Sequence, residues 1–218
     1  MRNALALVGS LSLLLAAGAG AATAPDVSKL ILRGSQVGPG YLLFQRSDGH
    51  GVKTQVTLNL CGTDYPSEAR RVTRLQTNYL HRNTTLGISN EVVTYRSGGA
   101  AQAMQEVARH VDGCPHRPID SGVKGLPKLL FEMSRVHDAH LLKGYVAVRI
   151  KASGTIKGKH LSQVSYAVYQ RRGDVLSGVY SFGPAGSDAA QRRLCLHAAE
   201  QSAANLLHGG NSPGGPTA

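Results

Sequence analysis

The chain has 218 residues, of which 24 are lysine or arginine and 13 are aspartate or glutamate, so its formal net charge at pH 7 is +11. This length corresponds to one domain of ordinary size, and the basic excess favours anionic partners such as lipids, wall polymers or acidic glycans. Only 5% of the residues are aromatic and tryptophan is absent. We expect no nucleic-acid partner, because surfaces that bind single strands stack bases on aromatic rings.

Residues 1–21 are typical of a signal peptide. Arg2 precedes an apolar run from Ala4 to Ala17, and Ala19-Gly20-Ala21 fits a small-x-small cleavage motif. The apolar run is shorter than the roughly 20 residues that a membrane span needs, although an uncleaved anchor is an alternative. We therefore expect cleavage after Ala21 and a secreted protein.

The remainder of the chain is predicted to form a single ligand-binding domain over residues 26–208. A disordered tail is expected over 209–218, where the sequence GGNSPGGPTA consists mainly of glycine, proline and small polar residues. The sequence shows no internal repeat.

The first half of this domain is predicted to consist mainly of strands. A short helix over 27–32 precedes a turn at Pro39, and Ser67 is expected to cap a helical turn. Alternating apolar and polar side chains and strand-forming residues predict strands over 41–47, 52–62, 72–80 and 89–95, the last two as an antiparallel pair.

A helix is predicted over about 99–114, directly after Gly98. Gly98 and Gly99 lack the third glycine of a dinucleotide-binding loop, so we expect a joint between strand and helix rather than a phosphate site. Pro115 ends the helix. The residues that share its apolar face are Ala100, Met104, Val107, Ala108 and Val111.

The second half of the domain is predicted to contain a meander and a final helix. A loop is expected over 115–127. Near the end of the chain, a helix is predicted over 188–207 because it carries an apolar stripe. Turns are expected at 152–160 and 171–174. They connect three predicted strands over 145–151, 161–170 and 175–182.

These elements indicate an α+β fold. The strands come in hairpins rather than in β-α-β units, which favours an antiparallel sheet of about five to seven strands. Two main helices, about 99–114 and 188–207, are expected to pack on it.

Three cysteines, Cys61, Cys114 and Cys195, allow three single pairings, and their spacing alone does not choose between them. We predict a Cys61–Cys114 disulfide, because Cys114 continues the inward stripe of its helix and Cys61 ends a predicted strand. Cys61 lies on the more polar side of that strand, so the pairing requires the helix to cover that side. Cys195 is expected to be buried and unreactive.

No catalytic motif is present: the sequence lacks a nucleophile elbow, a metalloprotease helix and a Cys-x-x-Cys pair. His137, Asp138 and His140 form the only tight cluster of metal-type ligands, but no third ligand follows at a characteristic spacing. We therefore expect neither a metal nor a cofactor. A small secreted hydrolase that uses a loop with His137 and His140 is an alternative function.

Tyrosines from the predicted meander are candidates for a binding surface, because the ring is apolar while the hydroxyl can hydrogen-bond. Basic residues stand at the ends of the same strands. We predict a cleft along this sheet for an amphipathic anionic ligand; alternatively, the tyrosines only fill core and surface. The predicted ligand-binding residues are Tyr145, Tyr166, Tyr169, Tyr180, Lys159, Arg171 and Arg172.

The stretch from Leu60 to Pro115 resembles the PknH-like extracellular (sensor) domain family of secreted actinobacterial proteins. The motifs that carry the resemblance are LCGTDYPSEARR and SNEVVTYRSGGAAQAMQEVARHVDGCP, which follow a GPGY turn. The resemblance implies an α/β domain with a cleft for an extracellular ligand and with stapling disulfides. Three cysteines instead of an even set depart from that pattern. Small mycobacterial lipoproteins of a sheet-plus-helix type are a related possibility.

From these observations we expect a secreted, non-catalytic, sensor-like module. Its expected partner is a small molecule or an envelope component such as a lipid or a wall fragment. The basic surface also favours peripheral contact with an anionic membrane. Besides the hydrolase, a structural envelope protein that acts through its basic surface is an alternative.

Overall fold

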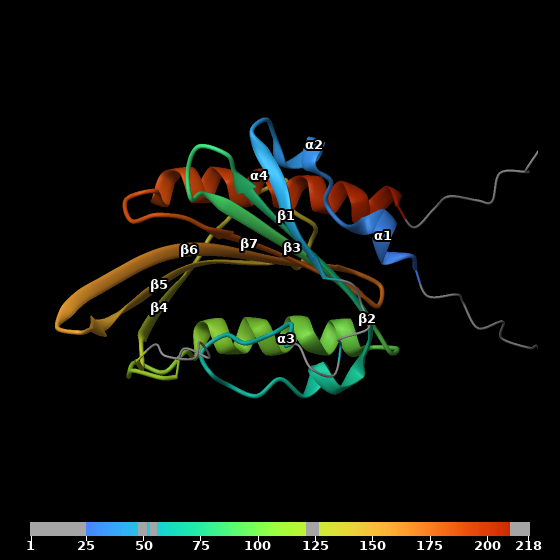
Figure 1. Ribbon diagram of the computed structural model, residues 1–218. Helices are drawn as coiled ribbons and strands as arrows, with labels where there is room; N and C mark the ends of the chain where they lie inside the picture. Colours follow the sequence, from blue (N-terminus) through green and yellow to red (C-terminus); the bar gives the residue numbers. More distant parts are fainter. Residues whose placement is uncertain (1–24, 48–51, 53–55, 121–126, 210–218) are drawn as a thin grey trace, which may run out of the picture.

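A computed structural model describes residues 25–47, 52, 56–120 and 127–209 (Figure 1). Within this part of the chain, seven antiparallel strands form one sheet in the order β1-β2-β3-β7-β6-β5-β4. The α+β prediction is confirmed. The strands are β1 (Tyr41–Ser47), β2 (Arg71–His81), β3 (Gly87–Tyr95), β4 (Leu130–Arg135), β5 (Val146–Ile156), β6 (Lys159–Arg172) and β7 (Val175–Phe182).

Helices cover both faces of the sheet. Figure 1 shows α3 on one face and α4 on the other, with the short α1 and α2 beside α4. None of the helices in the described part of the chain combines the length and the hydropathy needed to cross a membrane. The helices are α1 (Val27–Leu30), α2 (Gly34–Val37), α3 (Gly99–Asp112) and α4 (Asp188–His208), with a 3₁₀ helix, η2 (Pro66–Arg70), before β2.

The interior strand β6 shows why the fold has three layers. Tyr166 and Val168 pack in the cluster beneath α4, while Ala167 and Tyr169 pack in the cluster beneath α3, and all four are buried. Successive side chains of a strand point to opposite faces, so a strand without a polar face needs cover on both sides. The two main helices predicted from the sequence supply this cover, one on each face of the sheet.

The predicted meander is confirmed as β5, β6 and β7, but its first turn is shorter than expected. β5 and β6 pair as far as Ile156 and Lys159, so only Lys157 and Gly158 form the turn between them. Both residues have positive φ, 49° and 76°, as in the two-residue hairpin turns that match strand twist. The small and polar residues over 152–160 are therefore mostly strand, in an exposed extension of the hairpin.

The strand predicted over 52–62 is wrong for its described part, 52 and 56–62, which is turn and loop. The backbone N–H groups of Thr57 and Leu58 donate to the carboxylate of Glu68, at 2.9 and 3.2 Å, instead of to a neighbouring strand. A side chain thus provides the hydrogen bonds that a sheet would otherwise supply. Leu58 is nevertheless buried. The alternation of apolar and polar residues therefore predicted correctly that this side chain is buried, but not the secondary structure around it.

Other boundaries also differ from the prediction. The helix predicted over 27–32 is shorter than expected: α1 is a single turn that ends at Leu30, and a second single turn, α2, follows it. Ser67 does not cap η2, which begins at Pro66, because the Ser67 hydroxyl donates to Glu106 Oε2 at 2.6 Å. The edge strand β4 was not predicted, although its Phe131 and Met133 alternate and pack against the core beneath α3. The predicted signal peptide and the tail from 210 lie outside the described residues.

The first turn of α4 is tied to the sheet through Asp188. Its Oδ2 accepts hydrogen bonds from Arg149 Nη2 at 2.7 Å and Nε at 3.1 Å, and its Oδ1 accepts one from the Tyr166 hydroxyl. The Arg149 guanidinium, and then the Tyr166 hydroxyl, hold the pKa of this carboxyl below its usual value. A carboxylate in the first turn also interacts favourably with the helix dipole.

Asp188→Asn is expected to lower the free energy of unfolding at pH 7 by about 1 kcal/mol, the range of a partly exposed ion pair at a helix N-terminus. Because the folded-state pKa is depressed, this stability is present above the unfolded pKa of about 3.9 and is lost as pH falls through the folded pKa. Urea unfolding at pH 7, 5 and 3 should show the same difference at the first two values and a smaller one at pH 3. An equal difference at pH 3 would contradict this account.

Candidate functional site

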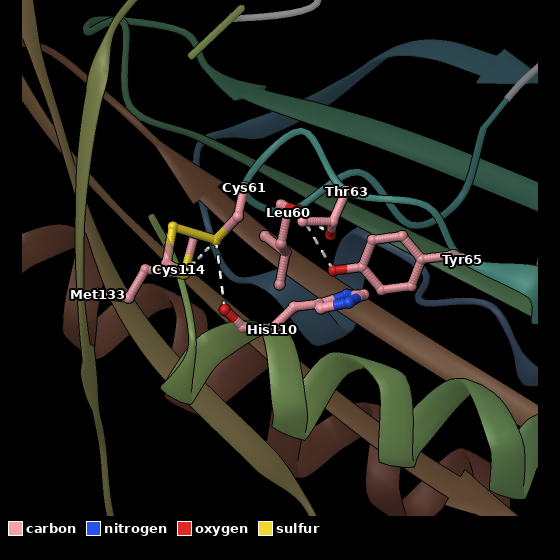
Figure 2. The surroundings of a disulfide bond; sticks show 7 residues. All are labelled: Leu60, Cys61, Thr63, Tyr65, His110, Cys114 and Met133. Carbon is pink, nitrogen blue, oxygen red and sulfur yellow. Dashed lines mark hydrogen bonds between the residues drawn. A yellow bond between two sulfur atoms is a disulfide. The ribbon is translucent and has the colours of Figure 1, made fainter. Parts of the chain in front are cut away.

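The disulfide between Cys61 and Cys114 joins the loop before η2 to the end of α3, which confirms the predicted pairing (Figure 2). Cys61 Sγ lies 3.4 Å from the carbonyl oxygen of His110 and 3.6 Å from Met133 Sδ. The Tyr65 ring meets the His110 ring edge-on, with centroids 4.6 Å apart. Cys61 belongs to a loop that α3 and β4 cover. The polar neighbours of Cys61 in the sequence therefore do not prevent its pairing with Cys114.

Cys195 is the free cysteine of the described chain, and it is fully buried in α4. Burial raises the pKa of its thiol to about 12. A thiol with such a pKa stays protonated at neutral pH, and the thiolate is the reactive form. The predicted burial of Cys195 is confirmed. Its low reactivity stays a prediction, for which the raised pKa gives the physical reason.

A groove of about 560 Å³ opens between α3 and the adjoining ends of β4, β5 and β6. This volume lies in the range of small-molecule sites. Its apolar part consists of Ala101, Met104 and Ala108 of α3 and Val146 of β5. The remaining lining residues are Gln105, Arg135, Lys143, Gly144, Tyr145 and Arg171.

Three basic side chains on different elements line this groove. Arg171 is the penultimate residue of β6, Lys143 lies in the loop before β5, and Arg135 ends β4. Arg135 forms a two-point ion pair with Asp112 of α3, in which both N–O distances are 2.8 Å. That pair holds the pKa of Asp112 below its usual value and fixes the end of α3 against β4.

The other two cations give the groove its electrostatic character. Within the part of the chain that the structure describes, no carboxylate lines the groove, and neither Lys143 nor Arg171 has an acidic partner within 4 Å. Arg171 Nη1 donates a hydrogen bond to the carbonyl oxygen of Gly173, at 3.4 Å. Two uncompensated positive charges beside an apolar wall form a surface suited to an amphipathic anion.

Tyr145 is held in position at the edge of this groove. Its hydroxyl accepts a hydrogen bond from the backbone N–H of Asp138 at 2.8 Å, and its ring packs against the cluster beneath α4. The ring contributes apolar area, while the hydroxyl is already engaged with the loop. Tyr145 and Arg171 are thus the two predicted ligand-binding residues that the fold brings together.

The other predicted residues lie elsewhere. Tyr166 is beneath α4, whereas Tyr169 and Tyr180 meet edge-on beneath α3, with ring centroids 5.6 Å apart. Arg172 Nη1 donates to the carbonyl oxygens of Leu206, at 2.8 Å, and Leu207, so it caps the C-terminus of α4. Lys159 starts β6, at the far end of the strand from Arg171.

Lys143 and Arg135 were not predicted as site residues. Each is an isolated basic residue in its own segment, and no local pattern distinguishes it from a solvated surface charge. Their relevance arises because the β4–β5 loop folds toward α3. His137 and His140, the histidines of the alternative hydrolase, are also on this loop, but neither lines the groove.

A larger cavity of about 740 Å³ lies beside η2. Its lining carries charges of both signs, and two of them, Glu68 and Arg71, form an ion pair at 3.1 Å. Because these charges compensate one another, the cavity has no clear preference for an anion. The groove beside α3 is therefore the better candidate site.

No protein-family model and no curated protein matches the sequence. Among solved structures, the fold is similar to the crystal structure of the extracellular domain of PknH from Mycobacterium tuberculosis. The TM-score is 0.52 at 12% sequence identity, and the match covers 80% of this chain and 93% of that chain. At this identity the match shows a common fold, which agrees with the fold implied by the sequence resemblance.

Proposed function

We propose that this protein is an extracellular, non-catalytic module that binds an amphipathic anionic ligand in the groove between α3 and the ends of β4, β5 and β6. The observation that carries the proposal is the pair of uncompensated cations, Lys143 and Arg171, beside an apolar wall. The predicted signal peptide and the disulfide support an extracellular location, because disulfides persist in oxidising compartments. The fold, which is also that of an extracellular domain, is consistent with this location.

The proposed ligand has an acidic head group and a short apolar portion. An anionic lipid and an acidic wall fragment both have this chemistry, and the head group would lie between Lys143 and Arg171 while the apolar portion contacts Met104. A groove of this kind favours ligand binding over a purely structural role, for which a closed surface would be sufficient.

Dodecyl phosphate, titrated below its micelle concentration and followed by calorimetry, provides the direct test. Lys143→Ala/Arg171→Ala is expected to weaken binding about tenfold, or about 0.7 kcal/mol for each partly exposed charge contact. Raising the salt concentration should weaken binding to the wild type, because exposed charges are screened. Dodecyl maltoside, which has a neutral head, should bind more weakly than dodecyl phosphate.

Lys128→Ala/Lys159→Ala is the matched control, because it removes the same net charge at exposed positions away from the groove. Its affinity should equal that of the wild type. The proposal fails if both double variants bind equally well, or if the neutral and anionic detergents bind alike. Anionic vesicles and soluble wall fragments then distinguish a lipid from a wall polymer as the source of the ligand.

A further inference from the structure

The loop between β4 and β5 meets the middle of α4 at three metal-type ligands. Asp138 and His140 belong to the loop, and Glu200 comes from α4, 60 positions after His140. His140 Nδ1 lies 3.1 Å from Asp138 Oδ1 and 3.6 Å from Glu200 Oε1. The three donor atoms all lie within 4.8 Å of one another.

We propose that Asp138, His140 and Glu200 bind a divalent transition-metal ion, with zinc as the preferred ion. Zinc in proteins is bound at about 2.0–2.1 Å by imidazole nitrogens and carboxylate oxygens, so donor atoms in a tetrahedral site lie roughly 3.3 Å apart. The two distances from the His140 nitrogen lie within a few tenths of an ångström of that value. Three protein ligands leave a fourth position open to water or to another molecule.

The loop is held in a conformation that presents these ligands. The Asp138 backbone N–H donates to the Tyr145 hydroxyl, at 2.8 Å, and the His140 backbone N–H donates to Asp138 Oδ1, at 2.9 Å. These bonds place the Asp138 carboxylate and the His140 ring on the side of the loop that faces α4. A metal would therefore meet a partly ordered site, which lowers the entropic cost of binding.

Electrostatics favours a cation between the two carboxylates. In the described part of this strongly basic chain, no lysine or arginine forms an ion pair with Asp138 or Glu200. Two carboxylates at this separation repel each other unless a positive charge compensates them. Imidazole and carboxylate together suit zinc and its neighbours in the first transition series, whereas magnesium and calcium prefer oxygen ligands alone.

The nearby histidines allow a strict control. His137 lies three residues before His140 in the same loop and is exposed, but it does not belong to the cluster. His137→Ala removes an imidazole from the same loop and leaves the three proposed ligands unchanged. This metal site shares no side chain with the proposed anion groove, so each proposal can fail independently of the other.

The test is a zinc titration of protein prepared without a histidine tag and freed of metal with a chelator. Competition with a chromophoric chelator should give one site per chain. His140→Ala and Glu200→Gln should each weaken binding at least tenfold, whereas His137→Ala should bind zinc as the wild type does. Cobalt should give a visible spectrum of low coordination number, which both ligand variants lose.

All three substituted side chains are at least partly exposed, so the variants should keep the unfolding midpoint of the metal-free wild type. Zinc should raise the midpoint of the wild type and of His137→Ala only. The proposal is overturned if zinc does not bind, or if it binds equally well to His140→Ala and Glu200→Gln. Equal weakening by His137→Ala would likewise place the ion elsewhere.

Discussion

Replacing Glu91 by alanine is expected to lower the free energy of unfolding by about 3–5 kcal/mol, because it removes the buried carboxylate that compensates the charge of the Arg74 guanidinium. The two side chains are 3% and 4% exposed and form an ion pair between β2 and β3. Glu91 Oε1 also accepts a hydrogen bond from the Thr57 hydroxyl at 2.8 Å. Burial raises the pKa of Glu91, and the Arg74 guanidinium opposes that shift.

Urea unfolding at pH 7 measures this effect. The matched control is Glu132→Ala, which breaks the exposed pair between Glu132 and Lys151, at 2.9 Å, and should cost at most about 1 kcal/mol. Arg74→Met/Glu91→Leu removes both charges and should recover much of the stability that Glu91→Ala loses. A loss for Glu91→Ala no larger than that of the control would show that the buried pair is not stabilised in this way.

Removal of the disulfide by Cys61→Ala/Cys114→Ala is expected to cost about 4 kcal/mol. The two cysteines are 53 residues apart in the sequence, and the chain-entropy model assigns about this value to a loop of that length. For a domain of this size, the loss corresponds to a fall in Tm of roughly 10 °C. The physical reason is that the unfolded chain regains conformations that the cross-link excludes.

Thermal and urea unfolding of the double variant check this value against two controls. Cys195→Ala removes the buried thiol, leaves the disulfide intact and should cost only about 1 kcal/mol. A thiol reagent should find no reactive group in the native wild type and one in the denatured, unreduced protein. A second free thiol in that denatured sample, or an unchanged midpoint in the double variant, would contradict the prediction.

Short-range patterns in the sequence were sufficient for most of the secondary structure. The period of 3–4 residues in Ala100, Met104 and Val107 predicted α3, and the final helix was predicted over nearly its observed length. The strands over 145–151, 161–170 and 175–182 were also predicted close to their observed positions. Such signals are local, because the side-chain direction repeats every 3.6 residues in a helix and every two in a strand.

Local sequence patterns were not sufficient to predict which residues come together in the candidate sites. Tyr145 and Arg171 were predicted to line a cleft, and both line the groove, but Arg172 caps α4 instead because the end of that helix folds beside it. Lys143 could not be distinguished from other surface lysines. A charge becomes part of a site through its three-dimensional neighbours, and sequence spacing does not encode these neighbours.

The sequence by itself therefore determined the fold class, the two main helices, most of the strands and the disulfide. The tertiary structure alone decided that Glu68 replaces a strand partner for residues 57 and 58, and that Glu200 completes a cluster with Asp138 and His140. The physical reason is the same in both cases. Local periodicity reports which side of an element is buried, whereas hydrogen bonds and ion pairs between distant segments form only when the sheet has placed those segments side by side.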